Sequence, residues 1–418
     1  MLDLIIIGAG LTGLMAACMA AQAGLKVKIV SKGLGALHWS AGTIDVLGYA
    51  DEQTPVERPL QMIQEFVKAH PRHPYALLNG AGLKDALQTF SSLTREIGLP
   101  YLNSGDVNLS LPSPVGAARP TFLAPQAQIT GDLSRTGPML IVGFRGMRDF
   151  FPELIAENLN KQGHPSRAVF LPLDLITDRH DSNTVQLANG LDDPARYKAL
   201  AAELKKLVQR SERVGLPAIL GVAQHADVMK DLQSATGAAV FEIPTLPPSV
   251  PGFRLMAALR RKVEALGVRV EVNMEVKGFR VENGRIASIE TDASARPLKH
   301  RAEKYLLATG GILGGGINSD HTGRVWEVCF NLPLAVPQQR SEWFRTRFLD
   351  PAGHPIFSTG VEVNRQFQPV DANGSPVYAN LWAAGGILAH ADPIRERSLE
   401  GIAIATSSAA VQHISTAA

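Results

Sequence analysis

The stretch Asp3-Leu-Ile-Ile-Ile-Gly8-Ala-Gly10-Leu-Thr-Gly13-Leu14 predicts a buried strand joined to a helix by a turn that contains three glycines. Gly8 allows the tight turn, Gly10 lets the backbone approach a pyrophosphate, and Gly13 lets the helix pack closely on the sheet. The helix, expected over residues 14–23, offers free N–H groups and a positive dipole end to an anion. Strand, glycine turn and helix together indicate a nucleotide-binding site rather than an ordinary turn.

The second strand, expected over residues 26–30, ends without the acidic residue that normally binds the ribose of a dinucleotide. Ser31 and Lys32 occupy that place. The missing carboxylate argues against a plain NAD site. The hydroxyl of Ser31 still offers a hydrogen bond, and Lys32 is a candidate contact for a cofactor phosphate. We therefore include both residues among the predicted cofactor-binding residues.

The size and composition of the chain restrict the class of protein. A chain of 418 residues is long for one core, which predicts two domains or one domain with a large insertion. A net charge of +2 gives no support to nucleic-acid binding. The sequence contains no run of about 18 apolar residues, so no membrane-spanning helix is expected. The first strand begins directly after the N-terminus, so we expect no signal peptide and a cytoplasmic protein.

The two cysteines, Cys18 and Cys329, lie far apart and form no Cys-x-x-Cys motif. The chain is therefore not expected to ligate an iron–sulfur cluster or a structural zinc, and no metal site is predicted. Cys18 lies within the first helix and is expected to be a small core residue rather than a reactive thiol.

The order of the expected elements predicts a nucleotide-binding domain interrupted by a cap. We place the boundaries of its successive parts at residues 1–50 (first part), 51–250 (inserted α/β cap lobe), 251–320 (second part), 321–375 (a cap segment) and 376–418 (final strand and helix). Within the inserted lobe, strands are expected over residues 139–144, 168–171, 218–222 and 238–243. The proline-rich connector 244–252 is interpreted as a rigid hinge or an active-site wall, with a plain linker as the alternative.

Two further strand ends carry glycine turns, namely Thr309-Gly310-Gly311 and Gly385-Gly386. Ligands bind beyond the carboxyl ends of strands in doubly wound sheets, so the three turns are predicted to meet at one ligand. The helix after Gly386, expected over residues 398–414, would offer a second set of N–H groups suited to an anionic flavin ring or its ribityl chain. A nicotinamide dehydrogenase needs only the first turn, so the three turns together favour a flavin.

The glycine turns also resemble those of a known group. The opening turn, Leu306-Leu-Ala-Thr-Gly-Gly311 and Leu381-Trp-Ala-Ala-Gly-Gly386 are similar to the two-dinucleotide-domain flavoproteins related to succinate dehydrogenase and fumarate reductase. Ser31-Lys32 is also found in that group. The resemblance implies an α/β, Rossmann-like two-dinucleotide-domain flavoprotein fold with an inserted α/β cap lobe. More specifically, the chain resembles the family formed by the B subunit of anaerobic glycerol-3-phosphate dehydrogenase in Ala36-Leu-His38-Trp-Ser40-Ala-Gly42-Thr-Ile-Asp45, His73-Pro-Tyr75-Ala-Leu-Leu78, Pro244-Thr-Leu-Pro-Pro-Ser-Val250 and Asp392-Pro-Ile394.

This resemblance implies a flavin cofactor, FMN in this family, with FAD as the alternative. It implies oxidation of sn-glycerol 3-phosphate to dihydroxyacetone phosphate, with electrons passed to menaquinone and fumarate or nitrate as terminal acceptor. The implied partners are an FAD-bearing catalytic A subunit and an iron–sulfur C subunit that anchors the complex at the inner membrane. The chain departs from the pattern at Arg395-Glu396-Arg397, where a glycine-rich run is expected, so close backbone approach to the flavin is in doubt there.

His38 is the candidate catalytic base, because related flavoproteins place residues of the loop after the second strand beside the ring. Ser40 and Gly42 in the same loop are predicted cofactor contacts. A loop histidine that hydrogen-bonds to backbone is the alternative reading of His38.

Arg395 and Arg397 are candidate ligands of a phosphate of the substrate or the cofactor, with solvated arginines at a helix start as the alternative. Arg145 and Arg148 would line the lobe interface if the insertion caps the flavin. Two other functions stay open: a stand-alone flavin dehydrogenase similar to fumarate reductase, and a non-catalytic structural or electron-relay subunit.

Overall fold

The computed structural model describes residues 1–50, 54–78, 82–179, 181–292 and 296–417. The chain forms two compact units. The first unit contains residues 1–36, 45–98 and 256–418, and the second contains residues 37–44 and 99–255. These boundaries differ from those expected from sequence, because residues 54–78, 82–98 and 321–375 belong to the first unit rather than to a cap.

The first unit is built on a five-stranded parallel sheet in the order β11-β2-β1-β15-β20, which agrees with the predicted doubly wound fold. Its strands in that order are Arg269–Glu271, Val27–Val30, Leu2–Ile7, Ala302–Leu307 and Leu381–Ala383. Ile7 lies opposite Val30 and Leu307, and Leu307 lies opposite Ala383, so these strands end level at their carboxyl edge. The strand order reverses between β1 and β15, which is where such sheets bind ligands.

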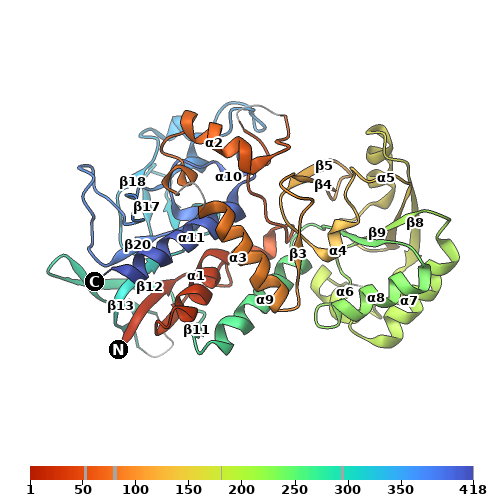
Figure 1. Ribbon diagram of the computed structural model, residues 1–418, viewed down its shortest axis with the longest axis horizontal. Helices are drawn as coiled ribbons and strands as arrows, with labels where there is room; N and C mark the ends of the chain where they lie inside the picture. The colour runs from red at the N-terminus through yellow and green to blue at the C-terminus, as the bar shows by residue number, and fades with distance from the viewer. Residues whose placement is uncertain (51–53, 79–81, 180, 293–295, 418) are drawn as a thin grey trace. The chain divides into compact units, whose positions relative to one another are not determined.

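Three helices of the first unit pack side by side (Figure 1): α1 (Leu11–Gln22) contacts α11 (Leu399–Thr416), which contacts α3 (Gly82–Glu96). Small side chains on α1, including Ala16 and Ala17, are fully buried and permit this packing. Cys18 is also fully buried, and burial raises the pKa of its thiol to about 12. This confirms the prediction that Cys18 is a core residue.

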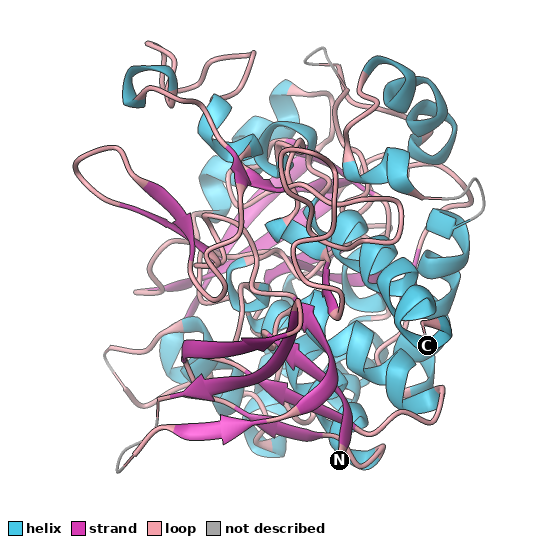
Figure 2. Cartoon of the chain, turned by 90° about the vertical axis from the view of Figure 1, so that its left-hand side faces the viewer, coloured by secondary structure: helices cyan, strands magenta, loops and turns pink. Residues whose placement is uncertain are grey.

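The first unit also contains a three-stranded antiparallel sheet of β12 (Val276–Glu282), β13 (Arg285–Thr291) and β14 (Leu298–His300). The turn between β12 and β13 has positive φ at Asn283 and Gly284, as the Asn-Gly pair predicts. In Figure 2 the N-terminus lies among strands of the unit and the C-terminus among helices. Its other elements are α2 (Pro59–Ala69), β16 (Ile317–Ser319), β17 (Val325–Glu327), β18 (Leu334–Ala335), β19 (Gly360–Val361) and α10 (Pro393–Glu396).

The second unit is built on a four-stranded parallel sheet in the order β10-β9-β7-β8. Its strands in chain order are β7 (Met139–Arg145), β8 (Ser166–Pro172), β9 (Arg213–Pro217) and β10 (Val240–Ile243). The strand expected over residues 218–222 is wrong: β9 ends at Pro217, and the following residues form a turn with positive φ at Gly221. The apolar run continues past the residues that pair with β7, so hydrophobicity alone placed the strand too late.

Helices α5 (Pro152–Lys161), α6 (Thr184–Gly190), α7 (Pro194–Leu207) and α8 (His225–Thr236) complete the α/β pattern of the second unit. Two antiparallel strand pairs precede it, together with the short helix α4; their bounds are Tyr101–Leu102 (β3) with Ala124–Pro125 (β6), Leu109–Pro112 (β4) with Ala118–Thr121 (β5), and Gln126–Ile129 (α4). The chain returns to the first unit within α9 (Val250–Ala265). In the described residues, every helix is too short or too polar to cross a membrane.

Candidate functional site

The three predicted glycine turns contact one another at the carboxyl edge of the first unit's sheet. A Cβ atom placed on Gly8 would lie 2.2 Å from the carbonyl oxygen of Ala308, beside the second turn. A Cβ on Gly311 would lie 2.4 Å from the carbonyl oxygen of Gly386, and one on Gly385 would lie 2.1 Å from the Thr12 hydroxyl. Only glycine permits approaches this close, so the three turns form one continuous backbone surface.

The first turn has the geometry of an anion site. Gly8 has a φ of +120°, and a Cβ on Gly13 would lie 1.9 Å from the Gly8 carbonyl oxygen, so both glycines are required by the backbone. Gly10 precedes α1 without a side-chain cap in the described chain, and the first turn of α1 holds no acidic residue. The positive end of α1 is therefore left for a ligand, which fits a flavin phosphate.

Ser31, at the end of β2, supports the first turn from behind. Its hydroxyl donates to the Gly33 carbonyl oxygen at 2.6 Å and accepts from the Ala9 N–H at 3.2 Å. Lys32 is mostly exposed, and its ammonium lies 2.9 Å from the Glu275 carboxylate. The structure thus bonds Ser31 to the backbone of the first turn, whereas the Lys32 side chain is paired with an acid.

The second and third turns bring side-chain hydroxyls to the same edge. The Thr309 Oγ1 atom is buried and has no hydrogen-bond partner in the described residues. Gly310, with a φ of +75°, and Gly311 follow it, and both are half-buried. In the third turn the Gly385 N–H donates to the Thr406 hydroxyl on α11 at 2.8 Å. The Thr309 hydroxyl is thus free to bond a ligand, and it also fits a flavin nucleotide.

The loop that carries His38 belongs to the second unit and packs on the proline-rich connector. The His38 carbonyl oxygen accepts from the Ser249 N–H at 2.7 Å. A Cβ on Gly252 would lie 1.9 Å from the Leu37 carbonyl oxygen, and one on Gly42 would lie 2.4 Å from Pro251 Cβ. The connector is therefore a wall against which the His38 loop is fixed, rather than a plain linker.

Within this loop the imidazole of His38 keeps an unused atom. His38 is half-buried in a 3₁₀ turn, and its Nδ1 atom is buried without a hydrogen-bond partner among the described residues. The Ser40 hydroxyl instead donates to the Leu37 carbonyl oxygen at 3.0 Å and accepts from the Gly42 N–H at 3.2 Å. Ser40 therefore shapes the loop, while His38 keeps a ring nitrogen that has no hydrogen-bond partner in the described residues.

The two arginines proposed for phosphate binding have partners within the first unit. Arg397 has a φ of +51°, and its guanidinium lies 2.9 Å from the buried Asp45 carboxylate. The Arg395 Nε atom donates to the Pro351 carbonyl oxygen at 2.9 Å. Asp392 caps α10 by accepting from the Ile394 and Arg395 N–H groups.

Sequence reasoning missed a buried group of side chains behind the start of α11. The His73 Nε2 atom lies 3.1 Å from the Glu396 carboxylate, and the Tyr75 hydroxyl donates to the Val46 carbonyl oxygen at 2.7 Å. A Cβ on Gly401 would lie 2.3 Å from that hydroxyl, so α11 is fitted closely to Tyr75. The only signal in the sequence was the His73-Pro-Tyr75 stretch, which gave a resemblance but no role.

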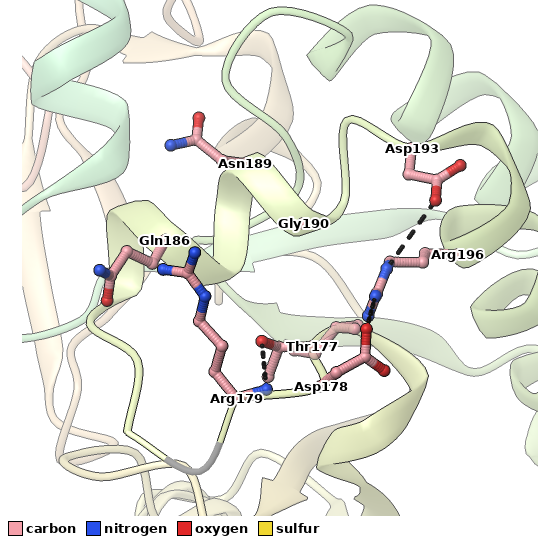
Figure 3. A pocket seen from close by; sticks show the side chains of 9 residues that line it. Thr177, Asp178, Arg179, Gln186, Asn189, Gly190, Asp193 and Arg196 are labelled. Atoms are coloured by element: carbon pink, nitrogen blue, oxygen red, sulfur yellow. Dashed lines mark hydrogen bonds and ion pairs between the residues drawn. The ribbon is translucent and has the colours of Figure 1, made fainter.

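The second unit contains a separate polar hollow of about 490 Å³ between α6, α7 and the loop after β8 (Figure 3). Arg196 lies in it between two carboxylates, those of Asp178 and Asp193. None of the predicted site residues lines it.

Arg145 stacks on Phe170, and Arg148 lies 3.6 Å from Asp181, with both members of that pair exposed. The described residues include no cluster of three or more His, Cys, Asp or Glu side chains suited to a metal ion.

Comparison with known proteins agrees with the nucleotide-binding role that the glycine turns indicate. A family model described as an FAD binding domain matches residues 3–402. The probable B subunit of anaerobic glycerol-3-phosphate dehydrogenase from Halobacterium salinarum is 33% identical over 98% of this chain and 96% of its own length. The B subunit of anaerobic glycerol-3-phosphate dehydrogenase from Vibrio vulnificus is 29% identical over 98% and 95%.

Among solved structures, 3-ketosteroid Δ1-dehydrogenase from Sterolibacterium denitrificans covers all of both chains with a TM-score of 0.49 and 12% identity. The family model spans nearly the whole sequence, and the archaeal and bacterial relatives match it from end to end. The chain thus belongs to the FAD binding domain family of flavoproteins and to the family formed by the B subunit of anaerobic glycerol-3-phosphate dehydrogenase.

Proposed function

We propose that this chain is the flavin-containing subunit of an anaerobic glycerol-3-phosphate dehydrogenase that oxidises sn-glycerol 3-phosphate to dihydroxyacetone phosphate. The observation that carries the proposal is the contact of three glycine turns at one sheet edge, in a chain related throughout its length to the B subunit of such dehydrogenases. The electrons go on to menaquinone, with fumarate or nitrate as the terminal acceptor. The reaction serves glycerol degradation.

The proposed cofactor is a flavin whose phosphate lies at the N-terminus of α1, against Gly8, Gly10 and Gly13. When bound, the flavin supplies the ring that accepts a hydride from the substrate carbon. FMN is the form that the family resemblance implies. FAD is the alternative that the FAD binding domain match favours. The Ser31 hydroxyl donates its proton to the Gly33 carbonyl oxygen and accepts from the Ala9 N–H, so it is engaged with backbone rather than offered to an adenosine ribose, which supports FMN.

The chain's own residues would hold the substrate and move its proton. His38 accepts the proton of the secondary hydroxyl on its imidazole, whose Nδ1 atom lacks a hydrogen-bond partner in the described structure. The hydrogen bond from Ser249 to its carbonyl oxygen fixes the loop, so the imidazole is held in place for this transfer. Arg395 and Arg397 bind the substrate phosphate as cations. Arg397 does so while Asp45 holds its Nε and Nη2 atoms.

The chain is proposed to act within a complex. Its relatives are named as subunits, which supports partner chains. The proposed partners are the FAD-bearing catalytic A subunit and the iron–sulfur C subunit, and the latter attaches the complex to the inner membrane. This chain would then be peripheral, held at the membrane through its partners.

The first test is the visible spectrum of the purified full-length chain. We expect a bound flavin, and acid release followed by chromatography identifies it as FMN or FAD. A preparation that contains no flavin after gentle purification contradicts the proposal and favours a structural subunit.

The second test is reduction of a dye acceptor by glycerol 3-phosphate, measured with this chain alone and with the FAD-bearing partner added. Activity that requires both chains supports the proposed role in a complex. Activity of this chain alone favours a stand-alone dehydrogenase. A flavin that is reduced only through the FAD-bearing partner, with no binding of glycerol 3-phosphate to this chain, identifies an electron relay.

A further inference from the structure

The helices α1 and α11 both begin beside the glycine turns, but their N-termini differ in charge. α1 follows Gly10 and has no acidic residue in its first turn. α11 begins at Leu399, whose Cδ1 atom would lie 3.2 Å from a Cβ on Gly386. The start of α11 is therefore next to the third glycine turn and, through Gly386 and Gly311, next to the second.

Carboxylates already surround the start of α11. Glu396 is 6% exposed and lies two residues before the N-cap residue Ser398, and Glu400 lies in the first turn. Asp45 accepts from Arg397, and its carbonyl oxygen accepts from the Gly401 N–H at 3.0 Å. Burial, followed by the negative charges of Glu396, Glu400 and Asp45, raises the pKa of Tyr75 well above its ordinary value.

The hydrogen bonds of His73 show which of its ring nitrogens carries the proton. The Tyr75 N–H donates to His73 Nδ1 at 3.1 Å, so Nδ1 carries no proton and the neutral ring carries its proton on Nε2. That Nε2–H donates to Glu396 Oε2 at 3.1 Å. His73 therefore binds Glu396 as a neutral donor and does not cancel its charge.

The other contacts of Glu396 also suit an ionised carboxylate. The Ser398 hydroxyl donates to Oε2 at 2.8 Å, and the Asp392 N–H donates to Oε1 at 2.9 Å. The Ser398 hydroxyl is thereby diverted from capping α11. The protein's own carboxylate thus lies against the N-cap residue of this helix, whose N-terminus is its positive end.

We propose that Glu396, held by His73 and Ser398, is a built-in anion that keeps the start of α11 from stabilising negative charge on the flavin. The proposal rests on the flavin-binding function proposed above. It reverses the expectation from sequence that α11 favours an anionic ring, and it leaves α1 as the helix that binds the phosphate. Glu396 then disfavours added electrons and lowers the reduction potential of the flavin.

The test is the midpoint potential of the flavin in the full-length protein, for the wild type and for Glu396→Gln. We expect the variant to raise the ratio of reduced to oxidised flavin at least tenfold at a fixed solution potential, a shift of about 30 mV for a two-electron couple. Glu271→Gln is the control, because Glu271 lies on the edge strand β11 of the same unit and pairs with Lys28 of β2. In Glu271→Gln the ratio of reduced to oxidised flavin is expected to change less than twofold at the same solution potential.

If Glu396→Gln does not fold, Glu400→Gln removes a charge from the first turn of the same helix and is expected to raise the potential in the same direction. A wild-type protein without flavin overturns both the proposed function and this inference. Flavin retained at full occupancy in the folded variants, with an unchanged potential, overturns this inference alone. A shift of equal size in Glu271→Gln also overturns it, because the effect would then be one of net charge.

Discussion

Gly385 and Thr12 approach so closely that a Cβ on Gly385 would lie 2.1 Å from the Thr12 hydroxyl oxygen. The two residues come from opposite ends of the chain, and their contact joins the third glycine turn to the helix that follows the first. Because Gly385 also has a φ of +79°, its environment excludes a larger residue both by backbone conformation and by space.

Gly385→Ala is therefore expected to lower the free energy of unfolding and the flavin content together. The positive φ costs about 1 kcal/mol for alanine, and the overlap with Thr12 adds about 1–3 kcal/mol more. Denaturant unfolding and the flavin-to-protein absorbance ratio measure the two effects. Gly24→Ala is the control, since Gly24 has a φ of +86° but nothing within 4 Å of its Cβ position. Equal losses in the two variants would show that the contact with Thr12 is unimportant.

A second prediction concerns a buried ion pair in the second unit, where Arg254 Nη1 lies 2.7 Å from the Glu242 carboxylate and both side chains are almost inaccessible. Burial works to raise the pKa of Glu242, but the Arg254 guanidinium and the His225 imidazole outweigh it and hold the pKa below its usual value. The folded protein therefore binds this proton more weakly than the unfolded chain. Stability from the pair is complete above the unfolded pKa and is lost as the pH falls through the folded value.

Arg254→Met removes one partner and leaves a buried carboxylate, so we expect a loss of about 3–5 kcal/mol at neutral pH. The loss should shrink in acid, where Glu242 becomes protonated. Denaturant unfolding of wild type and variant between neutral pH and about pH 3 checks both points. The exposed pair Arg148 and Asp181 provides the control, because Arg148→Met should change stability by less than about 0.5 kcal/mol. A loss that is independent of pH would contradict the assignment of the charge to Glu242.

The glycine turns could be predicted because each requirement is local. A strand followed by Gly8-x-Gly10-x-x-Gly13 specifies its own turn, and parallel strands necessarily bring their carboxyl ends to one edge. The fold class, the Asn283-Gly284 hairpin and the buried Cys18 follow from similarly short-range patterns.

The features that could not be predicted depend on partners distant in the sequence. His73 and Glu396 are 323 residues apart, and neither residue type indicates the other before the chain folds. The Ser31 hydroxyl looked available for a ribose, but Ala9 and Gly33 bind it. Residues 82–96 were expected in the cap because they lie in the long stretch after the nucleotide turn, and only the structure shows that helix α3 packs on α11.

His38 allows a direct test of proton transfer. If the His38 imidazole accepts the substrate proton, His38→Asn should lower kcat by about 10²–10⁴-fold while the flavin content and the unfolding transition stay unchanged. Steady-state dye reduction by the assembled complex measures kcat. His164→Asn, a change of a half-buried histidine in the same unit, should leave kcat as it is. A kcat within threefold of wild type in His38→Asn would exclude His38 as the base.

Arg397 and Asp45 should behave as one unit in stability. Arg397 bonds to the Asp45 Oδ2 atom through Nε at 3.2 Å and Nη2 at 2.9 Å. Asp45→Asn and Arg397→Met are each expected to cost about 2 kcal/mol, and the double variant should cost little more than either, because the second change finds the contact already lost. Denaturant unfolding of all three variants completes the cycle. Additive losses would mean that the two side chains act independently.

The same variants separate the structural role of Arg397 from the proposed binding of substrate phosphate. If the guanidinium binds glycerol 3-phosphate, Arg397→Met should raise KM at least tenfold, whereas Asp45→Asn, which keeps the cation, should raise it much less. Arg395→Met is the companion measurement. This variant removes the hydrogen bond from the Arg395 Nε atom to the Pro351 carbonyl oxygen. Because that hydrogen bond is exposed, we expect the variant to cost little stability while it raises KM. Equal KM values in wild type, Arg395→Met and Arg397→Met would remove both arginines from the substrate site and place phosphate recognition elsewhere in the complex.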